Sequence, residues 1–122
     1  MTTTELDIRA LDRELNETIL GGGILEAFEK FYAEDCVMQE NAEEPRVGKD
    51  VNREFEKAFL DSIAEFHGAR LLGSATGKDI SFSEWQFDVT FKEGGRVLMS
   101  QATVRRWKDG KVSSEHFYYN KG

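Results

Sequence analysis

The strongest constraint on the fold is a strict alternation of residue types over residues 81–91. Bulky apolar residues such as Trp85, Phe87 and Val89 stand at every second position, with polar residues between them. Successive side chains of a β-strand point to opposite faces of its sheet, so this pattern predicts a strand with one apolar and one polar face. Such a strand needs neighbouring strands and a cover over its apolar face.

Two glycine-containing turns supply those neighbours. The sequences Glu93-Gly94-Gly95 and Asp109-Gly110 each stand between runs with strand character, and Asp-Gly in this setting is a strong hairpin signal. We therefore expect hairpin-connected strands through the C-terminal half. The other expected strands cover residues 35–40, 63–74, 97–107 and 112–120.

Apolar residues at helical spacing precede most of the strand patterns. Ile8 and Leu15 belong to a first predicted helix, which ends at the glycines of residues 21–23 because they disfavour its continuation. A short second helix is expected next, with Phe28 and Tyr32 on one face.

A third helix is expected over residues 49–60. Its buried face should hold four apolar residues, namely Val51, Phe55, Ala58 and Phe59. Helices first and hairpins afterwards indicate an α+β fold, with the helices packed on one face of a strongly curved antiparallel sheet. The chain has 122 residues without a repeat or a linker, so we expect one domain over residues 1–122.

The hairpins also predict which strand residues share a face. With three-residue loops, Phe91 opposes Val97 and Trp107 opposes Lys111, whereas a two-residue turn at either place would exchange the faces. One face is then mostly aromatic and suits a ligand cavity beneath the helices. Its members are Trp85, Phe87, Val89, Met99, Gln101, Thr103, Glu115, Phe117 and Tyr119.

The opposite face carries smaller and mixed side chains. It includes Ala102, Val104, His116 and Tyr118, which make it too apolar for comfortable solvation. A two-fold contact between two such sheets would cover it, and two-fold dimers are the commonest soluble oligomers. We therefore expect a homodimer through Val104, His116 and Tyr118.

Composition excludes several classes of function. The net charge of −7, without a local basic stripe, argues against nucleic-acid binding. No apolar run reaches the roughly 18–20 residues of a membrane span. The single Cys36 and the acidic residues near the N-terminus favour a cytoplasmic location. Two scattered histidines and the absence of nucleotide or flavin motifs lead us to expect no metal and no cofactor.

Three motifs carry a family resemblance. They are the Phe-Tyr-Ala-Glu-Asp-Cys-Val of residues 31–37, the Pro-Arg-Val-Gly-Lys-Asp of residues 45–50 and the Trp-Lys-Asp-Gly-Lys-Val of residues 107–112. With these motifs in this order of elements, the chain resembles the superfamily that includes nuclear transport factor two, the SnoaL-like polyketide cyclases and ketosteroid isomerase. The resemblance implies a cone-shaped, cystatin-like α+β barrel with an internal pocket.

The resemblance also suggests a catalytic base. Glu40 stands where ketosteroid isomerase has its carboxylate base, but Asn16 and Thr103 stand where that enzyme has its oxyanion tyrosine and protonated aspartate. Because both are weaker donors for an enolate, the comparison speaks against steroid-type isomerisation. The SnoaL-like cyclases also use a carboxylate without a cofactor.

Three residues are candidates for acid–base chemistry. Glu40, desolvated by aromatic residues, could take a proton from a carbon next to a carbonyl; otherwise it is a solvated loop glutamate. Glu115 is either a carboxylate on the pocket face or part of a buried salt bridge with Arg105 or Arg70. His67 is a third candidate acid or base.

The expected ligand-binding residues are mostly aromatic, and Gln101 and Thr103 would orient the ligand by hydrogen bonds. The full set is Tyr32, Phe55, Phe59, Trp85, Phe87, Met99, Gln101, Thr103, Phe117 and Tyr119. The sequence therefore predicts a pocket for a small apolar or carbonyl-containing ligand. The function could be that of a cofactor-independent isomerase, cyclase or dehydratase, or that of a non-catalytic ligand-binding or dimerisation module.

Overall fold

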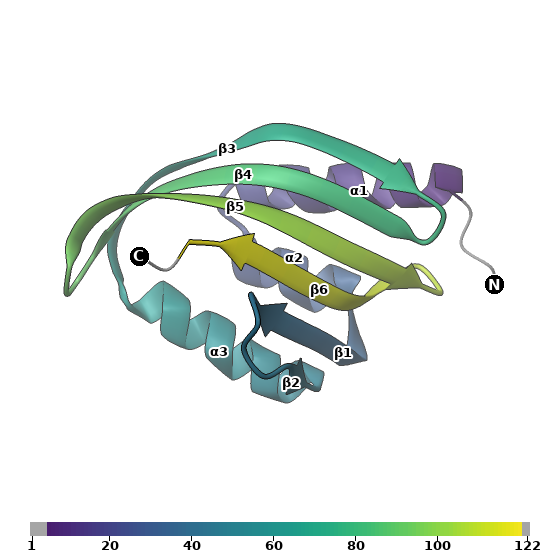
Figure 1. Ribbon diagram of the computed structural model, residues 1–122, viewed down its shortest axis with the longest axis horizontal. Coiled ribbons are helices and arrows are strands. Elements are labelled where there is room, and N and C mark those ends of the chain that lie inside the picture. The colour runs from purple at the N-terminus through teal and green to yellow at the C-terminus, as the bar shows by residue number, and fades with distance from the viewer. Residues whose placement is uncertain (1–4, 121–122) are drawn as a thin grey trace.

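The computed structural model describes residues 5–120. Within this range, three helices and six strands follow one another along the chain (Figure 1). Their order is α1 (Glu5–Leu20), α2 (Ile24–Phe31), β1 (Tyr32–Glu40), β2 (Arg46–Val47), α3 (Lys49–Asp61), β3 (Ile63–Gly77), β4 (Ile80–Phe91), β5 (Gly95–Lys108) and β6 (Lys111–Tyr119). No helix in this part of the chain is long and apolar enough to cross a membrane.

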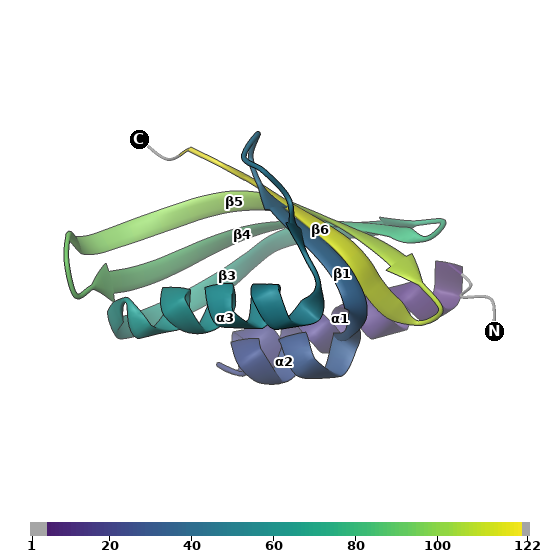
Figure 2. The same cartoon turned by 90° about the horizontal axis from the view of Figure 1, so that it is seen from below.

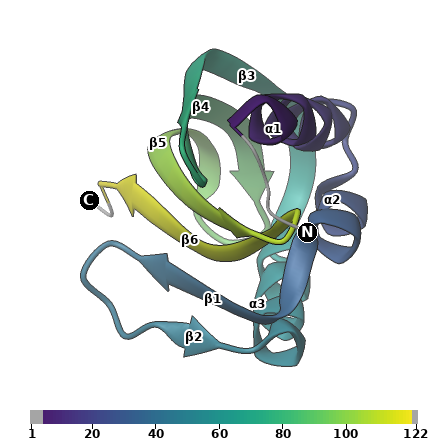
Figure 3. The same cartoon turned by 90° about the vertical axis from the view of Figure 1, so that its right-hand side faces the viewer.

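The strands form one curved sheet in the order β2-β1-β6-β5-β4-β3. Its two edges, β2 and β3, do not meet, so the sheet is open rather than closed into a barrel (Figure 3). The α+β class is confirmed, but the sheet is mixed because β1 and β6 pair in parallel. Strands β3 to β6 alternate in direction through three hairpins, and this alternation brings β6 alongside β1 in the same direction.

The three helices cover one side of the sheet and leave the other side bare (Figure 2). Helix α1 lies near the β3 edge, whereas α3 lies near β1 and β2. A cluster of buried residues from α1, α2, β1 and the β5–β6 hairpin forms the core: Ile8, Leu15, Ala27, Phe28, Phe31, Tyr32, Cys36, Met38, Trp107 and Val112.

The β4–β5 hairpin preserves the expected faces with a different pairing. Val97 lies opposite Val89, and Phe91 lies opposite Gly95, so the pairing differs by two residues from the expected one. Because side chains alternate with a period of two, a shift of two residues leaves every side chain on its face.

The β5–β6 hairpin reaches the expected faces through two departures that cancel. Asp109 and Gly110 form a two-residue turn with positive φ angles of 52° and 78°. Such a turn alone would exchange the faces of β6. However, the strand pairing is irregular next to Trp107 and leaves one extra residue of β6, Ser113, without a residue opposite it on β5. As a result, Thr103 opposes Phe117. The bulge restores the predicted arrangement.

Helix α2 ends one residue earlier than expected. Tyr32 is already extended, with φ of −100° and ψ of 141°, and it begins β1. Its side chain remains buried in the core, as helical spacing also predicted.

The buried face of helix α3 is only partly the apolar one that the sequence predicted, because its first turn buries a polar residue. Val51 is 54% exposed and Ala58 is also exposed, whereas Asn52 is fully buried. The Asn52 amide donates hydrogen bonds to the carbonyls of Arg46 and Gly48 at 3.0 and 2.8 Å. These bonds satisfy backbone groups at the β2–α3 connection, so polar contacts hold the start of this helix. Further along, the Phe59 ring packs against Phe91 at 6.2 Å between ring centroids.

Candidate functional site

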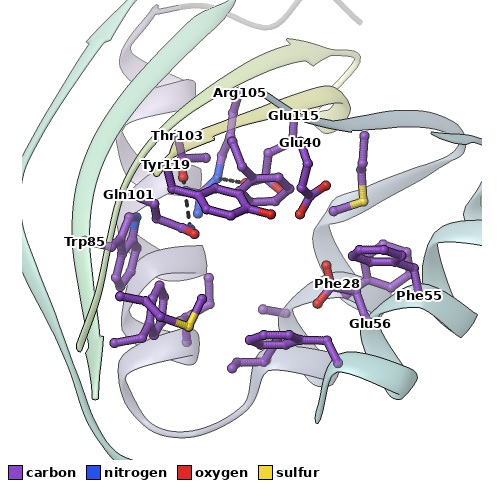
Figure 4. A pocket seen from close by; sticks show the side chains of 18 of the residues that line it. Phe28, Glu40, Phe55, Glu56, Trp85, Gln101, Thr103, Arg105, Glu115 and Tyr119 are labelled. Atoms are coloured by element: carbon purple, nitrogen blue, oxygen red, sulfur yellow. Dashed lines mark hydrogen bonds and ion pairs between the residues drawn. The ribbon is translucent and has the colours of Figure 1, made fainter. Parts of the chain in front are cut away.

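A cavity of about 150 Å³ lies between the concave face of the sheet and the helices (Figure 4). All ten residues expected to bind a ligand line it: Tyr32, Phe55, Phe59, Trp85, Phe87, Met99, Gln101, Thr103, Phe117 and Tyr119. Most of the remaining lining is also apolar and comes from α1, α2 and β1.

One wall of the cavity is built from aromatic rings of β3 and β4. The rings of Trp85 and Phe87 stack at 5.5 Å with an interplanar angle of 10°, and Phe66 meets Phe87 edge-on at 6.5 Å. The Trp85 indole N–H donates to the Ser83 hydroxyl at 2.8 Å, which satisfies its only polar atom. This wall therefore offers flat apolar surfaces to a ligand.

Glu40 lies in the lining at the end of β1, and its side chain is 12% exposed. Its Oε2 lies 2.7 Å from Nη1 of Arg46, but the angles are too poor for a hydrogen bond. The Arg46 guanidinium also packs 3.5 Å from the ring centroid of Phe55 and donates from Nε to Asn52 at 3.1 Å. Glu40 is thus a buried carboxylate with a counterion and not a solvated loop residue.

Glu115 belongs to a buried ionic network at the back of the cavity. Arg105 Nε donates to Glu115 Oε2 at 2.8 Å, and Arg105 Nη1 contacts Asp12 Oδ1 at 2.8 Å. The Tyr32 hydroxyl donates to the other oxygen of Glu115. Burial, followed by the charge of Glu115, raises the pKa of Tyr32 well above its ordinary value, so Tyr32 stays a neutral donor.

The same network ties α1 to the sheet. Asp12 accepts from the Ser81 hydroxyl at 2.8 Å, and Asn16 accepts from Arg105 at 2.7 Å. The polar groups of this network hydrogen-bond to one another, and Asn16 therefore has a structural role in it. Of the two pairs considered for Glu115, the structure contains the one with Arg105.

A third carboxyl group in the lining, Glu56 of α3, was missed by the sequence analysis. Among residues 5–120, no group forms a hydrogen bond or an ion pair with it. Burial, with the nearby charges of Glu115 and Glu40, raises the pKa of Glu56 to about 7. Glu56 follows the buried Asn52 by four residues and so lies on the same side of α3, but the burial of Asn52 is known only from the structure.

The structure does not bring His67 into the cavity. Its Nε2 lies 2.7 Å from the Thr90 hydroxyl and its Nδ1 lies 3.2 Å from Glu65. Of the three predicted acid–base residues, Glu40 and Glu115 line the cavity and His67 does not. Over the described range, no three His, Cys, Asp or Glu side chains are grouped so that they could hold a metal ion.

The fold and the cavity together define an α+β protein whose open, curved sheet and helices enclose an aromatic cavity with three carboxyl groups. The sequence profile of the SnoaL-like domain matches residues 9–119, and the chain belongs to this family. The comparison with curated proteins gives no match.

Solved structures agree with this assignment. A proposed SnoaL-like polyketide cyclase of Mesorhizobium loti, whose name also includes carbohydrate phosphatase, is 29% identical, with a TM-score of 0.84 over 92% of this chain and 98% of that one. A proposed polyketide cyclase of Xanthomonas campestris pv. campestris is 17% identical, with a TM-score of 0.77 over 95% and 92%. A nuclear transport factor two-like protein of unknown function from Burkholderia pseudomallei K96243 is 15% identical, with a TM-score of 0.79 over 93% and 91%. The last two share the fold alone.

Proposed function

We propose that this protein is a cofactor-independent enzyme, an isomerase, cyclase or dehydratase, that acts on a small apolar carbonyl compound with Glu40 as its base. The observation that supports this most is the position of Glu40. Its carboxylate lies in the wall of an aromatic cavity, with Arg46 as counterion on one side. A desolvated carboxylate in such a place can remove a proton from the carbon next to a carbonyl.

The remainder of the lining supports an apolar substrate. The stacked rings of Trp85 and Phe87 would hold a flat hydrocarbon part, and Gln101 and Thr103 would orient a polar one. The Mesorhizobium loti relative is named a polyketide cyclase, and this name supports a cyclase among the three reactions. A phosphorylated sugar would suit the site less well, because Arg46 and Arg105 already face carboxylates.

Hydrogen–deuterium exchange at the methyl group of acetophenone tests this proposal. Acetophenone is a small aromatic ketone, and removal of an α-proton in D₂O leads to deuterium incorporation that ¹H NMR detects. We expect the wild-type protein to accelerate the exchange and Glu40→Gln to reduce its rate by about 10²–10⁴-fold.

The matched control for this test is Glu44→Gln, which changes an exposed glutamate of the following loop and should leave the rate unchanged. Equal rates for the wild type and Glu40→Gln would contradict a role of Glu40 as the base.

A second candidate function is that of a non-catalytic ligand-binding or dimerisation module. It is favoured by the bare face of the sheet, where Phe82 and Tyr118 are 46% and 47% exposed. A hollow of about 120 Å³ on this face is lined in part by Val104, His116 and Tyr118. The His116 and Tyr118 rings stack at 4.1 Å, which provides a flat surface for a two-fold contact. Acetophenone binding without exchange would favour this alternative.

A further inference from the structure

We propose that Glu56 is the acid partner of Glu40: in its protonated form it donates a hydrogen bond, and then a proton, to the carbonyl oxygen of the ligand. The inference rests on the proposed function, because it assigns the second half of the same acid–base reaction. Nothing in the family resemblance suggested this residue. It follows from the surroundings of the carboxyl groups that line the cavity.

These carboxyl groups have different partners. Glu40 faces Arg46 at 2.7 Å, and Glu115 is held by Arg105 at 2.8 Å and by Tyr32. Glu56 has no such partner among the described residues. Figure 4 shows Glu40 and Glu56 on the same side of the cavity, one from β1 and the other from α3. An unpaired carboxyl near two paired ones is the group most easily kept protonated.

The charges around Glu56 come from several elements. After burial, the charges of Glu115 of β6 and Glu40 of β1 favour its protonated form most strongly, whereas Arg46 of β2 opposes them. Beyond these, Arg105 of β5 and Asp12 of α1 form their own buried pair at 2.8 Å behind Glu115. The charged neighbours of Glu56 on α3, Arg53 and Lys57, engage exposed carboxylates outside the cavity.

Other hydrogen-bond donors in the lining are less suited to the carbonyl oxygen. The Tyr32 hydroxyl already donates to Glu115, and its raised pKa makes it a poor acid. The Gln101 amide donates to the Thr103 hydroxyl at 3.4 Å, and neither group can transfer a proton near neutral pH. Glu56, with a pKa of about 7, can both donate and recover a proton there.

The step is balanced without an added reactant. Glu40 takes the proton from the α-carbon, the electron pair of that C–H bond forms a C=C bond, and the π pair of the carbonyl takes the proton of Glu56. An enol, protonated Glu40 and ionised Glu56 result. Return of a proton to carbon and removal of the enol proton by Glu56 restore both groups.

Infrared spectroscopy of bound acetophenone, labelled with ¹³C at the carbonyl, tests the donor contact directly. Hydrogen bonding lowers the carbonyl stretching frequency. In the wild-type protein we expect a lowered band at pH 5.5 that moves towards the unbonded frequency at pH 8.5, with a midpoint near the pKa of Glu56. Glu56→Gln retains an amide donor that does not titrate, so its band should not change with pH.

A matched variant on the same helix serves as the control. Glu54 is 75% exposed, and Glu54→Gln should retain the pH-dependent band of the wild type. In the exchange assay, we expect Glu56→Gln to lower kcat by about 10–100-fold with little change in KM, because Gln donates a hydrogen bond but transfers no proton. Glu56→Asp, which keeps a carboxyl group, should recover part of the pH dependence of the band and part of the kcat that Glu56→Gln loses.

The outcomes separate this inference from the proposed function. If Glu40→Gln stops exchange while Glu56→Gln exchanges at the wild-type rate and the wild-type band does not change with pH, the role of Glu56 is refuted and that of Glu40 stands. If the wild type shows no exchange but its band titrates and Glu56→Gln abolishes that titration, the donor contact is supported and the proposed reaction is refuted, together with Glu56 as its acid.

Discussion

Replacement of Glu56 by Gln should make the protein more stable at alkaline pH and should remove part of its pH dependence. The ordinary pKa of a glutamate is 4.5, and that of Glu56 in the folded protein is about 7. Between these values the folded chain binds a proton that the unfolded chain has released. Stability from this group is therefore fully present below pH 4.5 and is lost as the pH rises through about 7.

The size of the effect follows from the two pKa values. The difference between 4.5 and about 7 corresponds to about 3 kcal/mol of unfolding free energy as an upper limit. Because Glu56 is only partly buried, solvent screens part of its charge, and we expect about 2 kcal/mol. With a typical urea m-value, this corresponds to a midpoint shift of about 1 M.

Urea denaturation followed by tryptophan fluorescence, at several pH values between 4.5 and 8.5, measures this difference. We expect the wild type and Glu56→Gln to be similar near pH 4.5 and Glu56→Gln to be the more stable protein above pH 7. The contributions of groups that both proteins share cancel in the comparison. Glu54→Gln should follow the wild type. Parallel stability curves for the wild type and Glu56→Gln would refute the reasoning.

Two further predictions concern the buried ionic network around Arg105 and the bare face of the sheet. Arg105→Met should lower the unfolding free energy by about 3–5 kcal/mol, because it leaves Asp12 and Glu115 buried without a counterion. Arg96→Ala, which removes an exposed pair, should have a much smaller effect than Arg105→Met in the same urea assay. Val104→Asp combined with Tyr118→Asp should dissociate the proposed homodimer by placing unpaired charge in its interface. A wild-type chain that sediments as a 13.9-kDa monomer at micromolar concentration would contradict the proposed dimer.

Strict alternation accounts for most of what the sequence could predict. Trp85 and Phe87 stand two residues apart in one strand and share a face whatever the pairing. A shift of two residues in the pairing also keeps Met99 of β5 on that face, so the residues of the cavity wall were predictable even though the pairing was not. The bulge beside Trp107 was not predictable, because an extra unpaired residue depends on packing around the hairpin and not on the turn sequence. The parallel pairing of β1 and β6 joins residues 32–40 to residues 111–119, which lie far apart in the sequence, and no local pattern records such a contact.

The same reasoning explains why Glu56 was missed. The apolar residues of α3 predict that Val51 lies on the buried face, although that side chain is 54% exposed. The helix instead buries Asn52, which serves the backbone around it, and Glu56 lies one turn further on the same side. Polar residues buried for a specific contact carry no periodic apolar signal, so only the three-dimensional structure identified them.

A crystal structure of the protein with acetophenone at pH 6 tests most directly that this cavity is the functional site. We expect the ring of the ligand against Trp85 and Phe87, its carbonyl oxygen within hydrogen-bonding distance of Glu56, and its methyl group facing Glu40. Acetophenone bound elsewhere, or a ketone turned away from both carboxyl groups, would contradict the proposed chemistry.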